Sequence, residues 1–230
     1  MTLDRNESFI LYRFSFADGQ VVEHSIFPAG RSTPGEHAEW TRLGFHQCPH
    51  CPLANDEVEH CPFATALETP VRFLGDRLSH TEVDVQVLYR DRDIRQHTTL
   101  QRAVGTMLGA VGATSGCPHT EFLRAMAWFH QPFSDNDETL FRAVGTYLLG
   151  QHLRAMHGLD ADWSLGGLRE AYKKLRQVNQ GIAKRLRHAA QEDSSVNGLI
   201  LLDLLASSAL SVLDEYEGEL DEYFTAYLTQ

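Results

Sequence analysis

Four cysteines are the residues in this chain whose type and spacing best suit chemistry, and each is followed by proline. Cys48 and Cys51 form a Cys-x-x-Cys pair, the spacing with which one tight turn directs two sulfurs at one ion. Cys61 and Cys117 follow further along the chain. We therefore predict that Cys48, Cys51, Cys61 and Cys117 are the ligands of one metal site.

The identity of the ion follows from the ligand set. Four thiolates in a closed site are typical of structural zinc, so Zn²⁺ is the favoured occupant. A [4Fe–4S] cluster is the alternative, although the spacing is not the close run of a ferredoxin. Two disulfides or four thiols without a metal are the third interpretation. The sequence leaves open whether a flanking imidazole is a ligand: His46, His50, His60 and His119.

Proline after cysteine also predicts local structure. Proline suits the first helical position, where its missing N–H group would have no partner anyway. Cys61-Pro62 and Cys117-Pro118 therefore each predict the start of a helix. A thiolate at such a position is stabilised by unpaired N–H groups and the positive end of the helix dipole. We expect these helix ends to converge on the metal site.

Composition narrows the class of protein. The chain has 230 residues and 43% hydrophobic content, which is typical of a globular protein. Its net charge of −11 disfavours binding to nucleic acid, because a phosphate backbone favours a basic surface. The first residues contain no apolar signal core, and the longest apolar run, Leu199–Leu205, is too short to span a bilayer. We expect a cytoplasmic protein without membrane contact, and in that compartment cysteines favour metal over disulfides.

The first part of the chain reads as a small antiparallel sheet. Residues 8–27 predict a hairpin with an Asp18-Gly19 turn. Residues 82–89 alternate apolar and polar side chains, as a half-buried strand does, and 94–97 are a candidate fourth strand.

Helical patterns fill most of the remainder. Pro70 is expected to break or kink the first helix. Thr98 with Gln101, and Ser134 with Asp137, predict helix N-termini, and Gly158 predicts a C-terminus. The expected helices are 65–78, 98–112, 118–131, 134–157, 164–190 and 193–217.

The helix over 164–190 carries a regular heptad seam with one polar member, Asn179, which can fix register. Packing inside a bundle is the favoured interpretation, and a dimer contact through 165–189 is the alternative. The seam consists of Leu165, Leu168, Tyr172, Leu175, Asn179, Ile182, Leu186 and Ala189. The opposite face is basic, with Lys173, Lys174, Arg176, Lys184, Arg185 and Arg187. The acidic stretch 214–222 is a candidate to neutralise that face.

Three further features have two interpretations each. Residues 99–108 and 139–148 are similar, which is either an old duplication or chance, and Gly105 and Gly145 predict close helix crossings. Asp203 either faces water or pairs with a base. Polar residues near Cys117 either line a pocket or scatter over the surface: Arg124, His130, Glu138, Arg142 and His152.

The motif pattern resembles an uncharacterised bacterial family, classified only as a domain of unknown function. The likeness rests on Phe45–Cys51, on Thr98–His119 with its Ser115-Gly-Cys-Pro-His119 end, and on Phe129–Phe133. It covers most of the chain, and the Cys-Pro motifs are its most specific part. The resemblance implies a bacterial, cytoplasmic setting and brings no known activity or substrate.

The sequence thus predicts an α+β protein: a small antiparallel sheet, a Cys₄ metal loop and a bundle of about four long helices. We divide it into 1–97 and 98–230, sharing the metal site through Cys117. Because no phosphate-binding, hydrolase, metalloprotease or di-iron motif is present, we favour a structural zinc protein, monomeric, that contacts an unknown protein partner. The alternatives are an iron–sulfur redox protein, and an enzyme with Cys117 as nucleophile and His119 or His130 as base.

Overall fold

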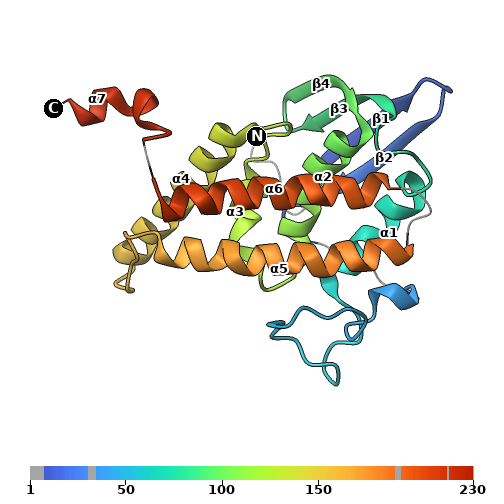
Figure 1. Ribbon diagram of the computed structural model, residues 1–230, viewed down its shortest axis with the longest axis horizontal. Coiled ribbons are helices and arrows are strands. Elements are labelled where there is room, and N and C mark those ends of the chain that lie inside the picture. The colour runs from blue at the N-terminus through green and yellow to red at the C-terminus, as the bar shows by residue number, and fades with distance from the viewer. Residues whose placement is uncertain (1–7, 31–34, 190–192, 217, 230) are drawn as a thin grey trace.

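The computed structural model describes residues 8–30, 35–189, 193–216 and 218–229 as an antiparallel sheet joined to a set of helices (Figure 1). The strands are β1 (Ile10–Phe16), β2 (Val21–Ile26), β3 (Glu82–Tyr89) and β4 (Arg92–Thr99). The longer helices are α1 (Pro62–Leu74), α2 (Leu100–Thr114), α4 (Asn136–Met156), α5 (Gly166–Ala189) and α6 (Ser194–Asp214). Shorter turns are η1 (Glu39–Thr41), η2 (Glu121–Leu123), α3 (Arg124–Trp128), η3 (Asp221–Phe224) and α7 (Thr225–Leu228). The predicted α+β class is confirmed.

The sheet has the order β2-β1-β3-β4, with every neighbouring pair antiparallel. Gly19 has a φ of 85° in the β1–β2 turn, and the Asp18 side chain accepts a hydrogen bond from the Gln20 N–H at 2.9 Å. The hairpin and the third strand are therefore confirmed, and the fourth strand is longer than predicted. One face of the sheet is buried through Ile10, Tyr12, Phe14, Phe16, Val83, Val85, Val87 and Tyr89.

The two Cys-Pro helix predictions have different outcomes. Cys61 is the N-cap of α1 and Pro62 is its first residue, as predicted. The expected break at Pro70 is wrong, because α1 continues through this buried proline. The helix expected over 118–131 begins later and is shorter. The chain first turns, with the Thr120 N–H donating to the Cys117 carbonyl at 3.0 Å, so the predicted start at Cys117-Pro118 is wrong. The η2 turn and α3 then cover residues 121–128.

Helix caps differ from the predictions by one residue. The N-cap of α2 is Thr99, without a side-chain hydrogen bond, so the predicted capping box at Thr98 is wrong. The capping box of α4 is formed by Asp135 and Glu138 rather than by Ser134 and Asp137. The predicted end of α4 is confirmed, since the chain leaves the helix at Gly158 with a φ of 70°.

Helices α5 and α6 run side by side along the molecule, and α6 also packs on α2 (Figure 1). The α2–α6 crossing is close at Gly105, where an added Cβ atom would lie 2.9 Å from the Gly198 carbonyl oxygen. Gly145 on α4 has no such neighbour within 4 Å. The close crossing predicted for Gly105 is therefore confirmed, and the one predicted for Gly145 is wrong.

The heptad seam of α5 is packed inside this chain, as favoured. Six of its members are buried: Leu168, Tyr172, Leu175, Asn179, Ile182 and Leu186. On the opposite face Arg185 is only 2% exposed, so its assignment to an exposed basic face is wrong. Asp203 of α6 pairs with Arg176 at 3.5 Å, so this acid does meet a base. Asp214 pairs with Arg169 at 2.6 Å, but Arg169 lies outside the predicted basic face, so neutralisation of that face by 214–222 stays a prediction.

The apolar run Leu199–Leu205 is the middle part of α6, and the helix stays apolar on both sides of this run. Of the described residues, Ser195–Asp214 form one helix long and apolar enough to cross a membrane, with a mean hydropathy of 1.8. A core helix meets the same criterion, and α6 packs against α2 and α5. One cluster of buried side chains includes residues from the sheet, α1, α2, α5 and α6, on both sides of position 97. The division into 1–97 and 98–230 stays a prediction.

Candidate functional site

The segment before α1 carries three of the four cysteines and forms an irregular loop that extends below α5 in Figure 1. Its two ends pair with each other. The Leu43 N–H donates to the Glu59 carbonyl at 2.8 Å, and the Cys61 N–H donates to the Thr41 carbonyl at 2.8 Å. The excursion from Leu43 to Glu59 is thereby closed at its base, and Cys48 and Cys51 lie within it.

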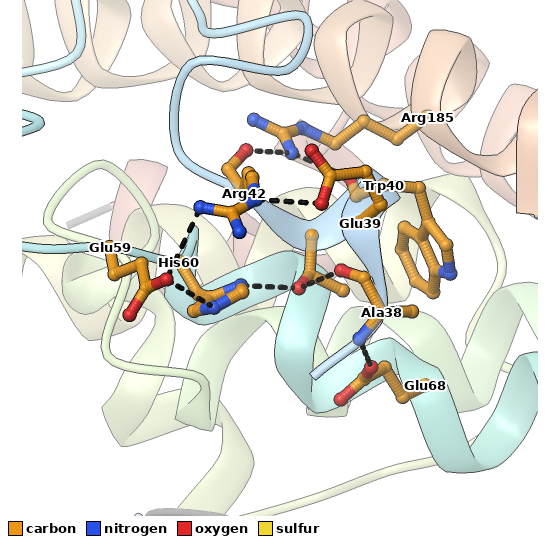
Figure 2. Close-up of polar contacts among 9 residues, drawn as sticks. Ala38, Glu39, Trp40, Arg42, Glu59, His60, Glu68 and Arg185 are labelled. Atoms are coloured by element: carbon orange, nitrogen blue, oxygen red, sulfur yellow. Dashed lines mark hydrogen bonds and ion pairs between the residues drawn. The ribbon is translucent and has the colours of Figure 1, made fainter. Parts of the chain in front are cut away.

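Arg185 of α5 anchors this loop. Figure 2 shows its guanidinium pointing at the loop backbone. It donates to the carbonyls of Trp40 at 2.8 Å, Arg42 at 2.7 Å and Leu43 at 2.9 Å. Among the described residues no carboxylate forms an ion pair with Arg185. The buried cation is thus held by backbone oxygens alone, and an anionic group nearby would stabilise it.

Side-chain contacts fix the rest of the loop base. The Thr41 hydroxyl lies 2.8 Å from Nδ1 of His60, and the Glu68 carboxylate accepts from the Ala38 N–H at 2.6 Å (Figure 2). His37 lies 2.6 Å from the other oxygen of Glu68. Helix α1 therefore holds the start of the loop while α5 holds its next residues.

Each cysteine has a defined place. Cys48 and Cys51 are joined by a turn in which the Cys51 N–H donates to the Cys48 carbonyl at 3.0 Å. Cys48 contacts α5 so closely that a Cβ atom added to Gly181 would lie 3.0 Å from its sulfur. Cys61 caps α1, and Cys117 is buried in the turn after α2. Cys48 therefore packs against α5, and Cys61 lies at the N-terminus of α1.

Contacts within two residues of the cysteines join the three motifs. His119 Nε2 lies 2.9 Å from the His50 carbonyl oxygen, which connects the Cys117 turn to the Cys48–Cys51 turn. A Cβ atom added to Gly116 would lie 3.9 Å from Pro62, which connects the Cys117 turn to the start of α1. The structure therefore brings the three Cys-Pro segments into one neighbourhood.

The thiols also affect one another electrostatically. Burial raises the pKa of Cys48 to about 11, helped by the charges of Cys61, Cys117 and Cys51, while Arg185 acts in the opposite direction. Burial likewise raises the pKa of Cys117, opposed by hydrogen bonding from the His119 and Thr120 backbone. A divalent cation reverses this balance, because a coordinated thiol is deprotonated outright.

The side chains near the cysteines are not arranged as a metal-binding site in the described residues. Within the part of the chain that the structure describes, no group of three or more His, Cys, Asp or Glu side chains is arranged so that it could hold a metal ion. The metal loop of the predicted fold is therefore unsupported as a structural feature. All four cysteines are free of disulfide bonds in the structure.

The flanking histidines differ in their surroundings. Both ring nitrogens of His50 are buried and make no hydrogen bond of good geometry among the described residues. Its ring lies 4.2 Å from that of His119. His46 has a φ of 49° and contacts the ring of His188 instead. Lys174 and Gln177 of α5 also act on the His50 ring, so it is not an empty ligand position. The sulfur donors of the nearby cysteines suit zinc.

Sequence reasoning missed the place of Arg185, and it favoured the wrong one of two interpretations for His130 and Arg142. The anchoring role of Arg185 left no local signal, because the residue lies in a run of exposed bases. His130 and Arg142, which the sequence favoured as surface residues, line a cavity of about 750 Å³. Of their predicted neighbours, Arg124 pairs with Glu121 at 3.0 Å and Glu138 caps α4. His152 is exposed.

Fold and site together define an α+β protein with a cysteine-bearing loop held on a set of helices. The chain belongs to the family described as Domain of unknown function (DUF6901), whose model matches residues 10–225. The predicted resemblance to an uncharacterised family is confirmed. Comparison with curated proteins gives no match, and comparison with solved structures gives none either.

Proposed function

We propose that this protein binds one zinc ion through Cys48, Cys51, Cys61 and Cys117, and that the ion is a structural link between the 43–59 excursion and the helices. The observation that carries the proposal is the joining of the three motifs by contacts adjacent to the cysteines. Bound zinc would supply a cross-link whose binding free energy adds to folding stability.

The charge pattern supports the same assignment. Four thiolates around a divalent ion carry a net charge of −2, and the buried Arg185 is the cation in electrostatic range of Cys61, Cys48 and Cys51. Its attachment to the loop carbonyls would keep that charge in place when the ion binds. Groups outside the ligands commonly orient and tune a metal site in this way.

The environment of Cys117 favours a closed site over catalysis. Its side chain is 8% exposed, and burial raises its pKa, whereas reactive cysteines are accessible and have a lowered pKa. It does not line the cavity of about 750 Å³ among the helices. The nucleophile hypothesis therefore has less support than the zinc hypothesis.

Metal analysis of anaerobically purified protein tests the proposal. We expect about one zinc ion per chain, and loss of that zinc in Cys117→Ser. A strong chelator should lower the melting temperature of the wild type and leave that of Cys117→Ser unchanged, which separates metal loss from simple mutational damage. Brown protein with iron and sulfide would select the cluster. Zinc-free protein indifferent to chelator would mean that the thiols are inert.

A protein partner, a monomeric state and a cytoplasmic location stay predictions from the sequence. The iron–sulfur alternative uses the same four residues, so the metal analysis decides it in the same experiment.

A further inference from the structure

A cavity lies away from the cysteines, among α2, α3, α4, α5 and α6. Its volume is about 750 Å³, within the range of about 300–1,000 Å³ usual for small-molecule sites. Most of its lining is apolar, with Leu123, Met126, Leu175, Leu201 and Leu202 among the contributors. A cavity of this size and lining fits a ligand with an apolar body.

Small residues of α2 form part of the cavity wall. Gly105, Gly109, Ala110 and Ala113 all line the cavity. A Cβ atom added to Gly109 would lie 3.4 Å from the Leu202 side chain, which is van der Waals contact. A much larger side chain at Gly109 would therefore have to displace Leu202 or extend into the cavity.

A positive charge lies at one end. Arg142 of α4 donates to the carbonyls of Met126 at 3.1 Å, Phe129 at 3.4 Å and Gln131 at 3.4 Å. Several of these bonds are long, and no carboxylate forms an ion pair with Arg142 among the described residues. Because a guanidinium stays charged in proteins, this wall of the cavity carries a cation, and Glu138 lies in electrostatic range of it without forming an ion pair.

Two further groups near Arg142, His130 and Tyr12, carry no charge of their own at neutral pH. His130 is 6% exposed and lies 2.7 Å from the Tyr12 hydroxyl. Burial, with the charges of Arg142 and Arg92, lowers the pKa of His130 to about 3, and burial also raises the pKa of Tyr12. Both groups are therefore uncharged at neutral pH, and they offer hydrogen bonds instead of counter-charge.

Two acids, Asp135 and Asp137, also line the cavity, and the hydrogen bonds that they and Glu138 accept hold them at the start of α4. Glu138 accepts from the Asp135 N–H at 3.0 Å and from the Gln131 amide at 2.8 Å. Asp135 accepts from the Glu138 N–H at 2.8 Å, and Asp137 accepts from the Tyr223 hydroxyl at 3.1 Å. These carboxylates hold the start of α4 and its contact with η3, while Arg102 adds a second cation to the lining.

We propose that this cavity binds a small amphiphilic anion, a medium-chain carboxylate in chemical class. The carboxylate lies at Arg142 beside His130, and the hydrocarbon chain lies along the small-residue face of α2. The site shares no residue with the proposed zinc ligands, so the two proposals stand or fall separately.

Isothermal titration calorimetry with three ten-carbon probes tests the assignment on the wild type. Decanoate should bind with a Kd below about 1 mM, and decanol and decyltrimethylammonium at least about tenfold more weakly. Equal binding of all three would overturn the charge assignment, because a purely apolar surface would bind the common alkyl chain whatever the head group. Absence of decanoate binding would overturn the proposal as a whole.

Variants then place the ligand. Arg142→Met should weaken decanoate binding about tenfold or more, while Arg142→Lys, which keeps the charge, should restore most of it. Gly109→Leu should abolish binding by filling the cavity, and Gly145→Leu, on open surface of α4, is its matched control. Circular dichroism checks that each variant folds. Unchanged affinity in folded Gly109→Leu would exclude this cavity.

Discussion

Replacement of Arg185 by methionine tests the loop anchor most directly. The change leaves the carbonyls of Trp40, Arg42 and Leu43 without their donor. A hydrogen bond to a charged group contributes about 1.5–3 kcal/mol, which gives a gross loss well above that of a single bond. The buried charge disappears too, and its desolvation cost, which lowers the pKa of Arg185, is recovered. We expect a net loss of about 3 kcal/mol in the free energy of unfolding.

Urea unfolding followed by circular dichroism measures this loss. Arg187→Met is the matched control, since Arg187 lies half a turn further along α5 and is exposed. Its effect should stay within about 0.5 kcal/mol. Arg185→Lys should recover only part of the loss, because one ammonium cannot reproduce the planar set of donors. A loss below about 1 kcal/mol in Arg185→Met would refute the anchor, as it would equal that of an ordinary substitution.

Three further predictions concern stability and assembly. Gly105→Ala should destabilise the fold by about 1–3 kcal/mol in urea unfolding, because its Cβ meets the Gly198 carbonyl, while Gly145→Ala should stabilise it by up to about 1 kcal/mol. Hydrogen bonds hold the pKa of Asp162 below its ordinary 3.8, and the bond from the Ser164 hydroxyl is the largest cause. Ionised Asp162 therefore stabilises the fold above that pH, and this stabilisation is lost as the pH falls through the lowered pKa. Asp162→Asn should flatten the acid limb of a stability–pH curve, and an unaltered limb would contradict this. Leu175→Asp should unfold the chain, since Leu175 is 9% exposed, and a folded monomer from a dimeric parent in light scattering would instead establish a dimer seam.

Local signals explain what the sequence predicted well. The Asp18-Gly19 turn, the alternation over 82–89 and the end of α4 at Gly158 depend on a few adjacent residues, whose backbone preferences act wherever they occur. Burial of the α5 seam follows from a period that only a helix can satisfy on one face.

Non-local contacts explain what it predicted badly. Gly105 and Gly145 stand in nearly the same local sequence, yet only the first meets another helix backbone. Arg185 looks like its exposed basic neighbours until the loop carbonyls are placed beside it. Pro118 favours a helix start, but the turn at Cys117 takes precedence, because tertiary contacts override propensity. Spacing alone cannot set the distances between cysteine sulfurs, so ligand geometry stayed beyond prediction.

The crossing of Gly105 over Gly198 has a consequence for how the chain reaches its native state. Its two partners are far apart along the chain, and the ribosome releases α2 well before α6. Until α6 arrives, the glycine face of α2 lacks its partner, and α6 itself emerges as the most apolar long helix of the protein. Long-range closures of this kind are slow and leave apolar surface open to aggregation. Docking of α6 therefore completes the core only after α6 has been made, and the narrow crossing favours glycine at the contact on both helices.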